Sequence, residues 1–400
     1  MSVRRRIPLA RVGEEGVRAI LEGLEMDGEH VREAAFDPES GALTVEVTDE
    51  EAASRVEAFV AGMGRTHRLI GRKVLRSTRA ERLAEGFSDS ELARSPDVRL
   101  IGEGLTGLSG NLLRLFRFFE RRFAALAAQY GAEDQHYPVM IPAALLAEMG
   151  YFGHFPQHVT FCCHFPDSLP LLESVAAEAG GAGADPEALG RSFGPRLAPP
   201  GHVLAPGVCL PCYAGQRDVV LEPGEVRVLT MQNHVFRYEA GNFRPLARGW
   251  DFTVRDIVLF GSGEDLTRLR SELMEQVHHL CLELDLSTTL ELANDPFFLD
   301  ASRDKAVYQR MGEVKYELLF ELPHRDAPLA ASSFNLHRDF YTSLYNIRRS
   351  DGGLAESACM GFGLERWLYG FISQKGLDPA GWPPAVAEAL GAVPAQPSSS

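Results

Sequence analysis

The first part of the chain alternates apolar and polar residues in a pattern that predicts a small α/β unit. A short apolar strand is expected at residues 7–12, and a strand of alternating apolar and polar residues at 42–47. Each is followed by a stretch with apolar residues at helical spacing, 14–26 after the first strand and 49–63 after the second. Residues 1–80 are therefore expected to form a domain of their own.

A larger unit is expected over residues 99–391. Residues 81–98 are polar and weakly periodic and are interpreted as a linker, and residues 392–400 as a flexible tail. Within the large unit, 176–201 is rich in alanine, glycine and proline and is expected to be an insertion or a mobile loop. A helix is predicted at 111–130, because large apolar residues recur there at intervals of four and three: Leu112, Phe116, Phe119, Phe123, Leu126 and Tyr130.

The rest of the large unit predicts an antiparallel sheet. Short strand patterns occur at 137–142 and 315–323, and further strands separated by turns are expected between residues 217 and 260. Helices are expected from Gly263 onward and at 362–374. Strands grouped in sequence, with helices before and after them, indicate the α+β fold class, with an antiparallel sheet flanked by helices.

The composition indicates a globular protein. The chain has 400 residues, of which 45% are hydrophobic, and a formal net charge of −15. This is ample apolar material for a core, and the negative charge argues against a large nucleic-acid interface. No apolar run suits a membrane span or a signal peptide, and six cysteines do not make a disulfide framework. We therefore expect a cytoplasmic protein with reduced thiols and no membrane contact.

Two neighbouring strand patterns carry charges where a plain core would carry apolar residues. In VFRYE, Arg237 and Glu239 are two residues apart and share a strand face. In RGWDFTVRD, the residues Arg248, Phe252 and Asp256 recur at intervals of four. Buried charges have to be paired or used. An aromatic platform, arginines for phosphate oxygens and carboxylates for a metal or an amine suit a nucleotide; the alternative is a solvent-exposed sheet face with incidental ion pairs.

The stretch ACMGFGLERWLYGFISQKG, residues 358–376, predicts a helix that begins with glycines and has a glutamate and an arginine in its first turn. Gly361 and Gly363 let another group approach the backbone closely, and a helix N-terminus favours anions. Arg366 adds a cation there, which indicates a polyphosphate, while Glu365 points away from the apolar face of the helix. The alternative is a C-terminal packing helix with an exposed arginine.

Together these stretches resemble the three motifs of class II aminoacyl-tRNA synthetases, in the same order. The helix 111–130 with the strand ending at Pro142 resembles motif 1, the FRYE hairpin resembles motif 2, and GFGLER resembles motif 3. SSFNLHRDFYTSLYNIR, residues 332–348, is similar to a stretch of the seryl-type enzymes. The likeness covers roughly residues 99–376, and it departs from the family at Asp256, where a glutamate is usual.

The resemblance implies a role for each candidate residue. Arg237 would hold the α-phosphate of ATP and the substrate carboxylate, Phe252 would stack on the adenine, and Arg366 would hold the γ-phosphate of a bent ATP. Catalysis would then rest on positioning and on charge neutralisation by arginines and Mg²⁺, without a protein nucleophile. The other ATP-binding residues would be Arg248, Asp256 and Ser333, and the amino-acid substrate would contact Glu239 and Asn335.

A zinc site is a further expectation. PGVCLPCYAG contains Cys209 and Cys212 as a CxxC pair, which by itself is half a zinc knuckle, a redox pair or chance. The chain also resembles atypical methanogen-type seryl-tRNA synthetases and amino acid:[carrier protein] ligases, in which a zinc ion takes the substrate α-amino group. That resemblance implies Cys209, Glu239 and Cys359 as ligands, with Cys212 as the substitute for Cys209. A second candidate metal site combines two adjacent cysteines with nearby histidines: Cys162, Cys163, His158 and His164.

Three functions are candidates for this chain, and they differ in the acceptor of the activated amino acid. GYFGHFPQHVTF, residues 150–161, resembles a stretch of the amino acid:[carrier protein] ligases, with His154 where they have a serine. The favoured function is therefore activation of a small amino acid with ATP, as an aminoacyl-adenylate, and its transfer to the phosphopantetheine thiol of a holo-carrier protein. The alternatives are a seryl-type tRNA synthetase, for which residues 1–80 lack coiled-coil heptads, and a non-catalytic paralogue that binds ATP or an adenylate.

Two assembly predictions follow from the same resemblance. Motif 1 usually forms a two-fold interface, so the helix 111–130 and the strand to Pro142 predict a homodimer; intramolecular packing of the helix is the alternative. Carrier proteins are usually acidic around their phosphopantetheine serine, so docking needs a local basic surface. The basic cluster between Arg65 and Arg82, with Arg68 and Arg72 at its centre, is the candidate surface, and a solvated linker is the other interpretation.

Overall fold

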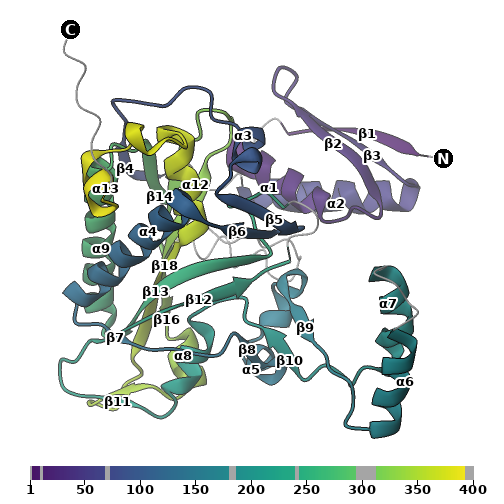
Figure 1. Cartoon of the computed structure of the whole chain (residues 1–400). Coiled ribbons are helices and arrows are strands. Elements are labelled where there is room, and N and C mark those ends of the chain that lie inside the picture. The colour runs from purple at the N-terminus through teal and green to yellow at the C-terminus, as the bar shows by residue number, and fades with distance from the viewer. Residues whose placement is uncertain are drawn as a thin grey trace.

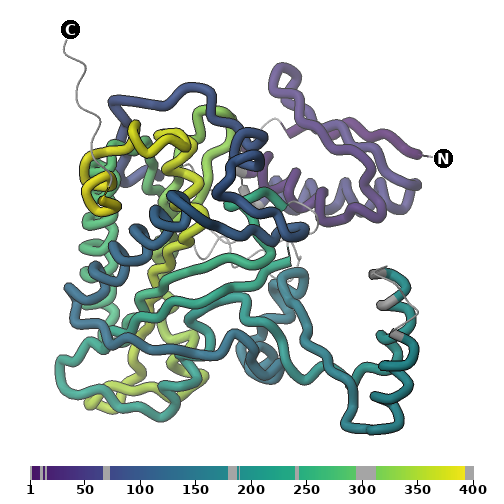
Figure 2. Tube along the Cα trace, viewed as in Figure 1, coloured from purple at the N-terminus to yellow at the C-terminus, as the bar shows by residue number. Residues whose placement is uncertain are grey.

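The computed structural model of the protein has a small N-terminal unit beside a large unit that is built on one broad sheet (Figure 1). The same arrangement is visible in the chain trace of Figure 2, where the N-terminal unit is purple. Four predictions fall outside the described residues, namely those on Glu239, Arg68, Arg72 and the tail 392–400. The structure describes residues 2–9, 12–67, 73–179, 186–238, 243–293 and 312–391.

The N-terminal unit consists of three antiparallel strands and two helices. In chain order the elements are β1 (Val3–Pro8), α1 (Glu14–Glu25), β2 (Val31–Asp37), β3 (Ala42–Val47) and α2 (Glu50–His67), and the strand order is β1-β3-β2. The first strand begins earlier than the sequence predicts, because alternation in VRRRIP already half-buries every second residue. Strand β2 was not predicted, because most of its side chains are exposed and the core signal is weak.

The large unit is organised by an eight-stranded sheet, which confirms the predicted fold class. All neighbouring strands are antiparallel, except for β7, which runs parallel to β12. The strands, in spatial order, are β4 (Val74–Thr78), β14 (Thr288–Leu292), β15 (Lys315–Phe320), β16 (Leu329–Arg338), β18 (Glu356–Gly363), β13 (Asp251–Gly261), β12 (Arg227–Phe236) and β7 (Glu133–Asp134).

The passage between the two units is more structured than the expected linker. Strand β4 lies within residues 1–80 but pairs with β14 at the edge of the large sheet. Residues 81–98 contain a short helix, α3 (Asp89–Arg94), whose start is capped by the Ser88 side chain. A hairpin of β5 (Val98–Gly102) and β6 (Leu105–Leu108) follows it.

Long helices cover one face of the large sheet. α4 (Gly110–Gln129), α9 (Gly263–Glu283) and α12 (Leu364–Lys375) bury their apolar stripes against this face, and α13 (Pro384–Ala389) packs on α4 at its edge. Figure 1 shows these helices together on one side of the strands. Helix α4 is the predicted helix 111–130 to within one residue at each end.

The apolar stripe of α4 is buried inside the chain and does not face outward. Phe119 and Phe123 are fully buried and contact the indole of Trp367 on α12, with ring centroids 5.6 and 5.0 Å apart. Phe123 also stacks on Phe362, 4.3 Å away. Because α12 and the sheet cover it, this stripe takes part in the intramolecular packing that was the alternative, and the homodimer stays a prediction.

The opposite face of the sheet carries shorter elements and a second core. Leu146 of α5 (Ala143–Glu148), Tyr213 of α8 (Leu210–Gly215) and the sheet residues Val258 and Phe260 are buried there together. Strand β13 thus alternates, with Ile257 and Leu259 on the helical side. Three smaller elements complete this side: α11 (Phe340–Leu344), and the parallel pair β11 (Val220–Leu221) and β17 (Arg348–Arg349).

The predicted insertion, residues 176–201, belongs to a pair of helices that projects from the large unit (Figure 1). A small sheet in the order β8-β10-β9 supports it, made of β8 (Met140–Pro142), β9 (Thr160–Cys162) and β10 (His202–Leu204). Where a mobile loop was the prediction, the described parts of this region are helical: α6 (Leu169–Ala179), α7 (Pro186–Phe193) and the 3₁₀ turn η3 (Gly194–Arg196). The other 3₁₀ turns are η1 (Tyr151–Gly153), η2 (Pro156–His158) and η5 (Pro379–Gly381).

None of the helices in the described ranges has the length and apolar character that crossing a bilayer requires.

Candidate active site

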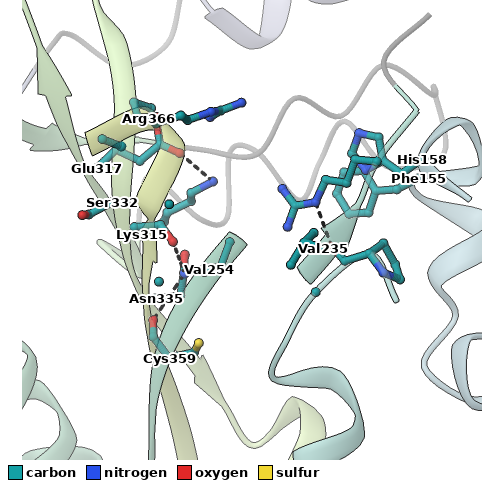
Figure 3. Close-up of a pocket in the computed structure, with 18 of the residues that line it drawn as sticks. Phe155, His158, Val235, Val254, Lys315, Glu317, Ser332, Asn335, Cys359 and Arg366 are labelled. Carbon is teal, nitrogen blue, oxygen red and sulfur yellow. Dashed lines mark hydrogen bonds and ion pairs between the residues drawn. The ribbon is translucent and has the colours of Figure 1, made fainter. Parts of the chain in front are cut away.

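A cavity of about 550 Å³ lies on the sheet face that is not covered by α4, α9 and α12. Strands β13, β15, β16 and β18 form its floor, and residues from the loop before α8 and from η2 form the opposite wall (Figure 3). The structure brings nine predicted site residues to this one cavity: Cys209, Arg237, Arg248, Phe252, Asp256, Ser333, Asn335, Cys359 and Arg366.

The β12–β13 hairpin positions an arginine over an aromatic ring. Arg237 follows the last residue of β12, and its Nε donates to the carbonyl of Pro206 at 2.8 Å. Its guanidinium lies 5.7 Å from the centroid of Phe252, which is on the cavity face of β13. A planar guanidinium with remaining donors, next to an exposed ring face, can hold a phosphate or carboxylate beside a stacked base.

The start of α12 sends its two charged residues in opposite directions. Arg366 lines the cavity, and its Nε and Nη1 donate to the carbonyls of Ala247 and Ala330, each at 3.1 Å. The Glu365 carboxylate instead accepts a hydrogen bond from the backbone N–H of Thr253 at 2.8 Å. Burial raises the pKa of Glu365 to about 7, and the charge of the nearby His234 opposes that shift.

The two glycines before α12 differ in the space around them. Gly361 lies opposite Asp256 across β13 and β18, and a Cβ at that position would meet the Asp256 Oδ1 at 2.9 Å. Gly363 has an ordinary φ of −77°, and a Cβ there would meet nothing closer than 3.6 Å. Gly361 therefore makes room for a buried carboxylate, and both glycines also line the cavity.

Two thiols and one carboxylate meet at the lower end of the cavity. Cys209 at the start of α8, Asp256 on β13 and Cys359 on β18 place their ligand atoms within 4.8 Å of one another. Asp256 is only 5% exposed, and burial raises its pKa to about 6, against hydrogen bonds from the Cys209 and Cys359 thiols and the charge of Arg237. A set of two sulfurs and one carboxylate oxygen has the donor chemistry of a three-ligand zinc site.

The other proposed metal ligands do not join this cluster. Cys212 is fully buried within α8, and burial raises its pKa well above the ordinary value. Cys162, Cys163, His158 and His164 form no group of three possible ligands, since Cys209, Asp256 and Cys359 are the one such group in the ranges that the structure describes. Asp256, expected to contact ATP, is thus the carboxylate that the fold places with the two cysteines.

Sequence reasoning missed an ion pair on the cavity floor. Lys315 and Glu317 lie two apart on β15, both line the cavity, and Nζ and Oε1 are 2.9 Å apart (Figure 3). Lys315 is only 7% exposed. The available signal was two charged residues on the same face of the otherwise apolar strand KYELLF. Beside them, the Asn335 amide donates to the Ser333 hydroxyl at 3.1 Å and is thereby oriented.

The segment 150–161 contributes to the opposite wall. Tyr151, Phe155 and His158 line the cavity, and the Tyr151 hydroxyl lies 3.3 Å from the His158 Nδ1. Figure 3 shows Phe155 and His158 facing the strands across the cavity. His154, which replaces a serine of the resembled stretch, is not among the lining residues.

Comparison with known proteins places the chain in a family. No family model matches the chain. Among curated proteins, amino acid–[acyl-carrier-protein] ligase 2 of Bradyrhizobium diazoefficiens is 30% identical over 261 residues, which cover 65% of this chain and 75% of the relative. The type-2 serine–tRNA ligase of Methanopyrus kandleri is 27% identical over 269 residues, 65% of this chain and 51% of the relative. The chain belongs to this family of class II synthetase-like ligases.

Solved structures agree with this class II ligase fold. The structure described as Aquifex aeolicus tRNASec in complex with the M. kandleri seryl-tRNA synthetase matches with a TM-score of 0.70 at 22% identity, over 100% of this chain and 80% of that one. The cytoplasmic serine–tRNA ligase of Naegleria fowleri in complex with AMP matches with a TM-score of 0.61 at 10% identity. At these identities the matches establish the fold. The sequence match spans about half the length of the M. kandleri ligase.

Proposed function

We propose that this ligase activates a small amino acid with ATP and transfers it to the phosphopantetheine thiol of a carrier protein. The observation that supports the proposal is the meeting, in one cavity, of the Arg237–Phe252 pair, Arg366 and the Cys209–Asp256–Cys359 cluster. A nucleotide site and a site for a metal or an amine are thus close enough for one small substrate to reach both.

In the first step, an oxygen of the amino-acid carboxylate attacks the α-phosphorus of ATP, and the bond to the bridging oxygen breaks. The products are the aminoacyl-adenylate and pyrophosphate. Arg237 would hold the α-phosphate and the substrate carboxylate, Phe252 the adenine, and Arg366 and Arg248 the outgoing phosphates. Preorganised cations of this kind stabilise the charge that develops in the transition state, without a covalent intermediate on the protein.

The amino group of the substrate would be held at the thiol–carboxylate cluster. Cys209, Asp256 and Cys359 would hold Zn²⁺, which would supply a Lewis acid for an uncharged α-amino group. Asn335, held by its hydrogen bond to Ser333, lies next to Cys359, whose carbonyl accepts a second one at 3.4 Å. The amide would therefore position the substrate beside the cluster.

The Lys315–Glu317 pair would serve the phosphates. Glu317 supplies a carboxylate to the floor of the cavity that Arg366 also lines. Mg²⁺ bound to ATP prefers one or two carboxylates and water as its other ligands. Lys315 would exchange its partner Glu317 for a phosphate oxygen once Mg²⁺ engages that carboxylate. Both residues are expected to affect ATP use and not the choice of amino acid.

The acceptor assignment is supported by the carrier-protein ligase of Bradyrhizobium and by the segment 150–161. In the second step, a thiol attacks the carbonyl carbon of the adenylate, a thioester forms and AMP leaves. Transfer to tRNA is the second candidate, because the structural match to a tRNA-bound synthetase covers the whole chain, including the N-terminal unit. A regulatory protein without activity is the third, and the presence of all three phosphate-site arginines around the cavity disfavours it.

One loading experiment tests the proposal. The protein is incubated with ATP, Mg²⁺ and labelled glycine, alanine or serine, with holo-carrier protein, apo-carrier protein or total tRNA as the acceptor. We expect hydroxylamine-sensitive label on the holo-carrier protein alone, and a loss on the order of 100-fold in Arg366→Ala. Label on tRNA would move the assignment to a tRNA synthetase. The absence of amino-acid-dependent ATP–pyrophosphate exchange would overturn the activation step itself.

A further inference from the structure

Helix α1 of the N-terminal unit contacts the core of its own unit with one face and lines the cavity with another. Val17, Ile20 and Leu24 are spaced by three and four residues and are buried in the core of the N-terminal unit. Arg18, Glu22 and Glu25, offset from them around the helix, line the cavity of the large unit. The N-terminal unit therefore supplies part of the wall of the candidate active site.

One ion pair joins this wall to the phosphate site. The Glu22 Oε1 lies 3.3 Å from Nη2 of Arg248, and their side chains are 31% and 27% exposed. Arg248 lies in the turn before β13, where it is an expected ligand of the ATP phosphates. A carboxylate on a guanidinium uses the same N–H donors and the same positive charge that a phosphate would use.

The N-terminal unit has a hydrophobic core of its own. Its apolar core is made by residues of its own strands and helices, and no residue of the large unit belongs to that cluster as far as the structure describes the chain. A shift of the whole unit would then leave this core intact. Such a unit can change its position at the cost of polar contacts, of which Glu22–Arg248 is one.

We propose that the N-terminal unit is a gate on the ATP site, and that Glu22 occupies Arg248 in place of a phosphate until ATP displaces it. This inference rests on the proposed function, since it requires ATP phosphates at Arg248. ATP and the docked position of α1 compete in two ways. The phosphates need the guanidinium donors of Arg248, one of which Glu22 engages, and a polyphosphate in the cavity is repelled by the carboxylates of Glu22 and Glu25.

The gate predicts that removing one negative charge improves ATP binding. The experiment measures the affinity of the intact protein for a non-hydrolysable ATP analogue with Mg²⁺ by calorimetry, at one fixed ionic strength. Glu22→Gln is expected to bind the analogue about two- to fivefold more tightly, the range that a partly exposed ion pair supports. Glu51→Gln on α2, whose carboxylate pairs with Arg55, removes a matched charge away from the cavity and is expected to bind like the unaltered protein.

A double substitution separates a direct effect from a general one. Arg248→Gln is expected to weaken analogue binding. Adding Glu22→Gln to it should bring a smaller gain than in the unaltered protein, because the pair is already broken and only the repulsion between Glu22 and the phosphates is removed. Analogue binding that is indifferent to Glu22, or weaker in Glu22→Gln, would overturn the gate and leave the proposed function standing. A protein that binds no ATP analogue at all would overturn the proposed function, and the gate with it.

Discussion

Two adjacent residues, Glu365 and Arg366, show how much a single helix start decides. Both lie in the first turn of α12, yet Arg366 reaches the cavity and Glu365 is buried against β13. The carboxylate satisfies the backbone N–H of Thr253 and fixes the start of the helix relative to the sheet. Glu365 thereby fixes the helix turn from which Arg366 reaches the cavity, and the carbonyls of Ala247 and Ala330 hold the Arg366 guanidinium.

The buried carboxyl of Glu365 makes stability depend on pH. Its pKa is about 7 in the folded protein and near 4.5 when exposed, so the unfolded chain loses its proton first as pH rises. The stabilising contribution of the neutral form is therefore present below about pH 4.5 and is lost as pH rises to about 7. Thermal unfolding is measured at pH 5 and pH 7.5. The melting temperature of Glu365→Gln, relative to that of the unaltered protein, should be higher at pH 7.5 than at pH 5.

The comparison needs a control, because Asp256 titrates in a similar window. Its pKa is raised to about 6, also by burial, and it contributes the same sign of pH dependence in both proteins. The difference between the two melting temperatures cancels that contribution. A difference that does not change between pH 5 and pH 7.5 would contradict the assignment of a raised pKa to Glu365.

The thiol–carboxylate cluster predicts the metal content of the isolated protein. About one zinc per chain is expected, because three ligands of the right chemistry converge at one point. Cys209→Ser and Cys359→Ser should lose the zinc, and Asp256→Asn should bind it more weakly, as measured by elemental analysis after gel filtration. Cys212→Ala and Cys281→Ala, which change buried cysteines outside the cluster, should retain it.

Glu239 is the alternative carboxylate for this site. If Glu239→Gln lost the zinc while Asp256→Asn kept it, the sequence-based ligand set would be restored and the cluster of the structure rejected. A protein without zinc in every preparation would remove the metal from the proposed function.

At the scale of elements, the site depends on how closely α12 lies on the sheet. Gly370 is the contact point, since a Cβ there would meet the ring of Phe320 on β15 at 2.4 Å. On one side of the sheet this close packing buries Trp367. On the other side, β15 carries Lys315 and Glu317 into the cavity. The position of the helix and the shape of the cavity floor are thus coupled through one strand.

Adding a methyl group at this contact should therefore destabilise the protein. Gly370→Ala is expected to lower the free energy of unfolding by about 1–3 kcal/mol, because the aromatic ring has to move. Gly190→Ala in α7 is the matched control, since nothing lies within 4 Å of its Cβ position. That substitution should stabilise by about 0.4–1 kcal/mol through the unfolded chain. Equal effects of the two in urea unfolding would contradict the close contact.

At the scale of the whole molecule, the surface for self-association has to be sought away from the stripe of α4. The hairpin β5–β6, immediately before α4, exposes a group of apolar residues: Leu100 at 55%, Ile101 at 76% and Leu105 at 37%. Exposed apolar side chains gathered on one hairpin favour a protein–protein contact. This hairpin is therefore a better candidate for the contact surface of the predicted homodimer than the apolar stripe of the helix that follows it.

Light scattering tests the homodimer and its location together. The unaltered protein at micromolar concentration is expected at twice the chain mass of 44.0 kDa. Ile101→Glu should shift it toward the monomer, because a charge in the contact has to be desolvated. Leu83→Glu, at another exposed leucine, should remain a dimer. A monomeric unaltered protein would refute the homodimer prediction, and a dimer that is insensitive to Ile101→Glu would exclude this hairpin.

Local patterns in the sequence determined the elements and most of the chemistry. The periodicity of residues 111–130, the charged positions of the FRYE hairpin and the sequence GFGLER are local signals, since each is fixed by the spacing of side chains along one helix or strand. They predicted the antiparallel α+β fold and five of the residues that line the cavity, namely Arg237, Arg248, Phe252, Asp256 and Arg366. The family resemblance added four more lining residues: Cys209, Ser333, Asn335 and Cys359.

Only the tertiary structure decided which of these residues meet. Cys209, Asp256 and Cys359 come from three segments far apart in the chain, and strand register alone sets Asp256 opposite Gly361, where there is room for its carboxylate. The partners of α4 and the contact between Glu22 and Arg248 are long-range in the same way. A sequence pattern shows which face of an element is apolar or charged. What covers that face depends on the packing of distant segments, which no local spacing records.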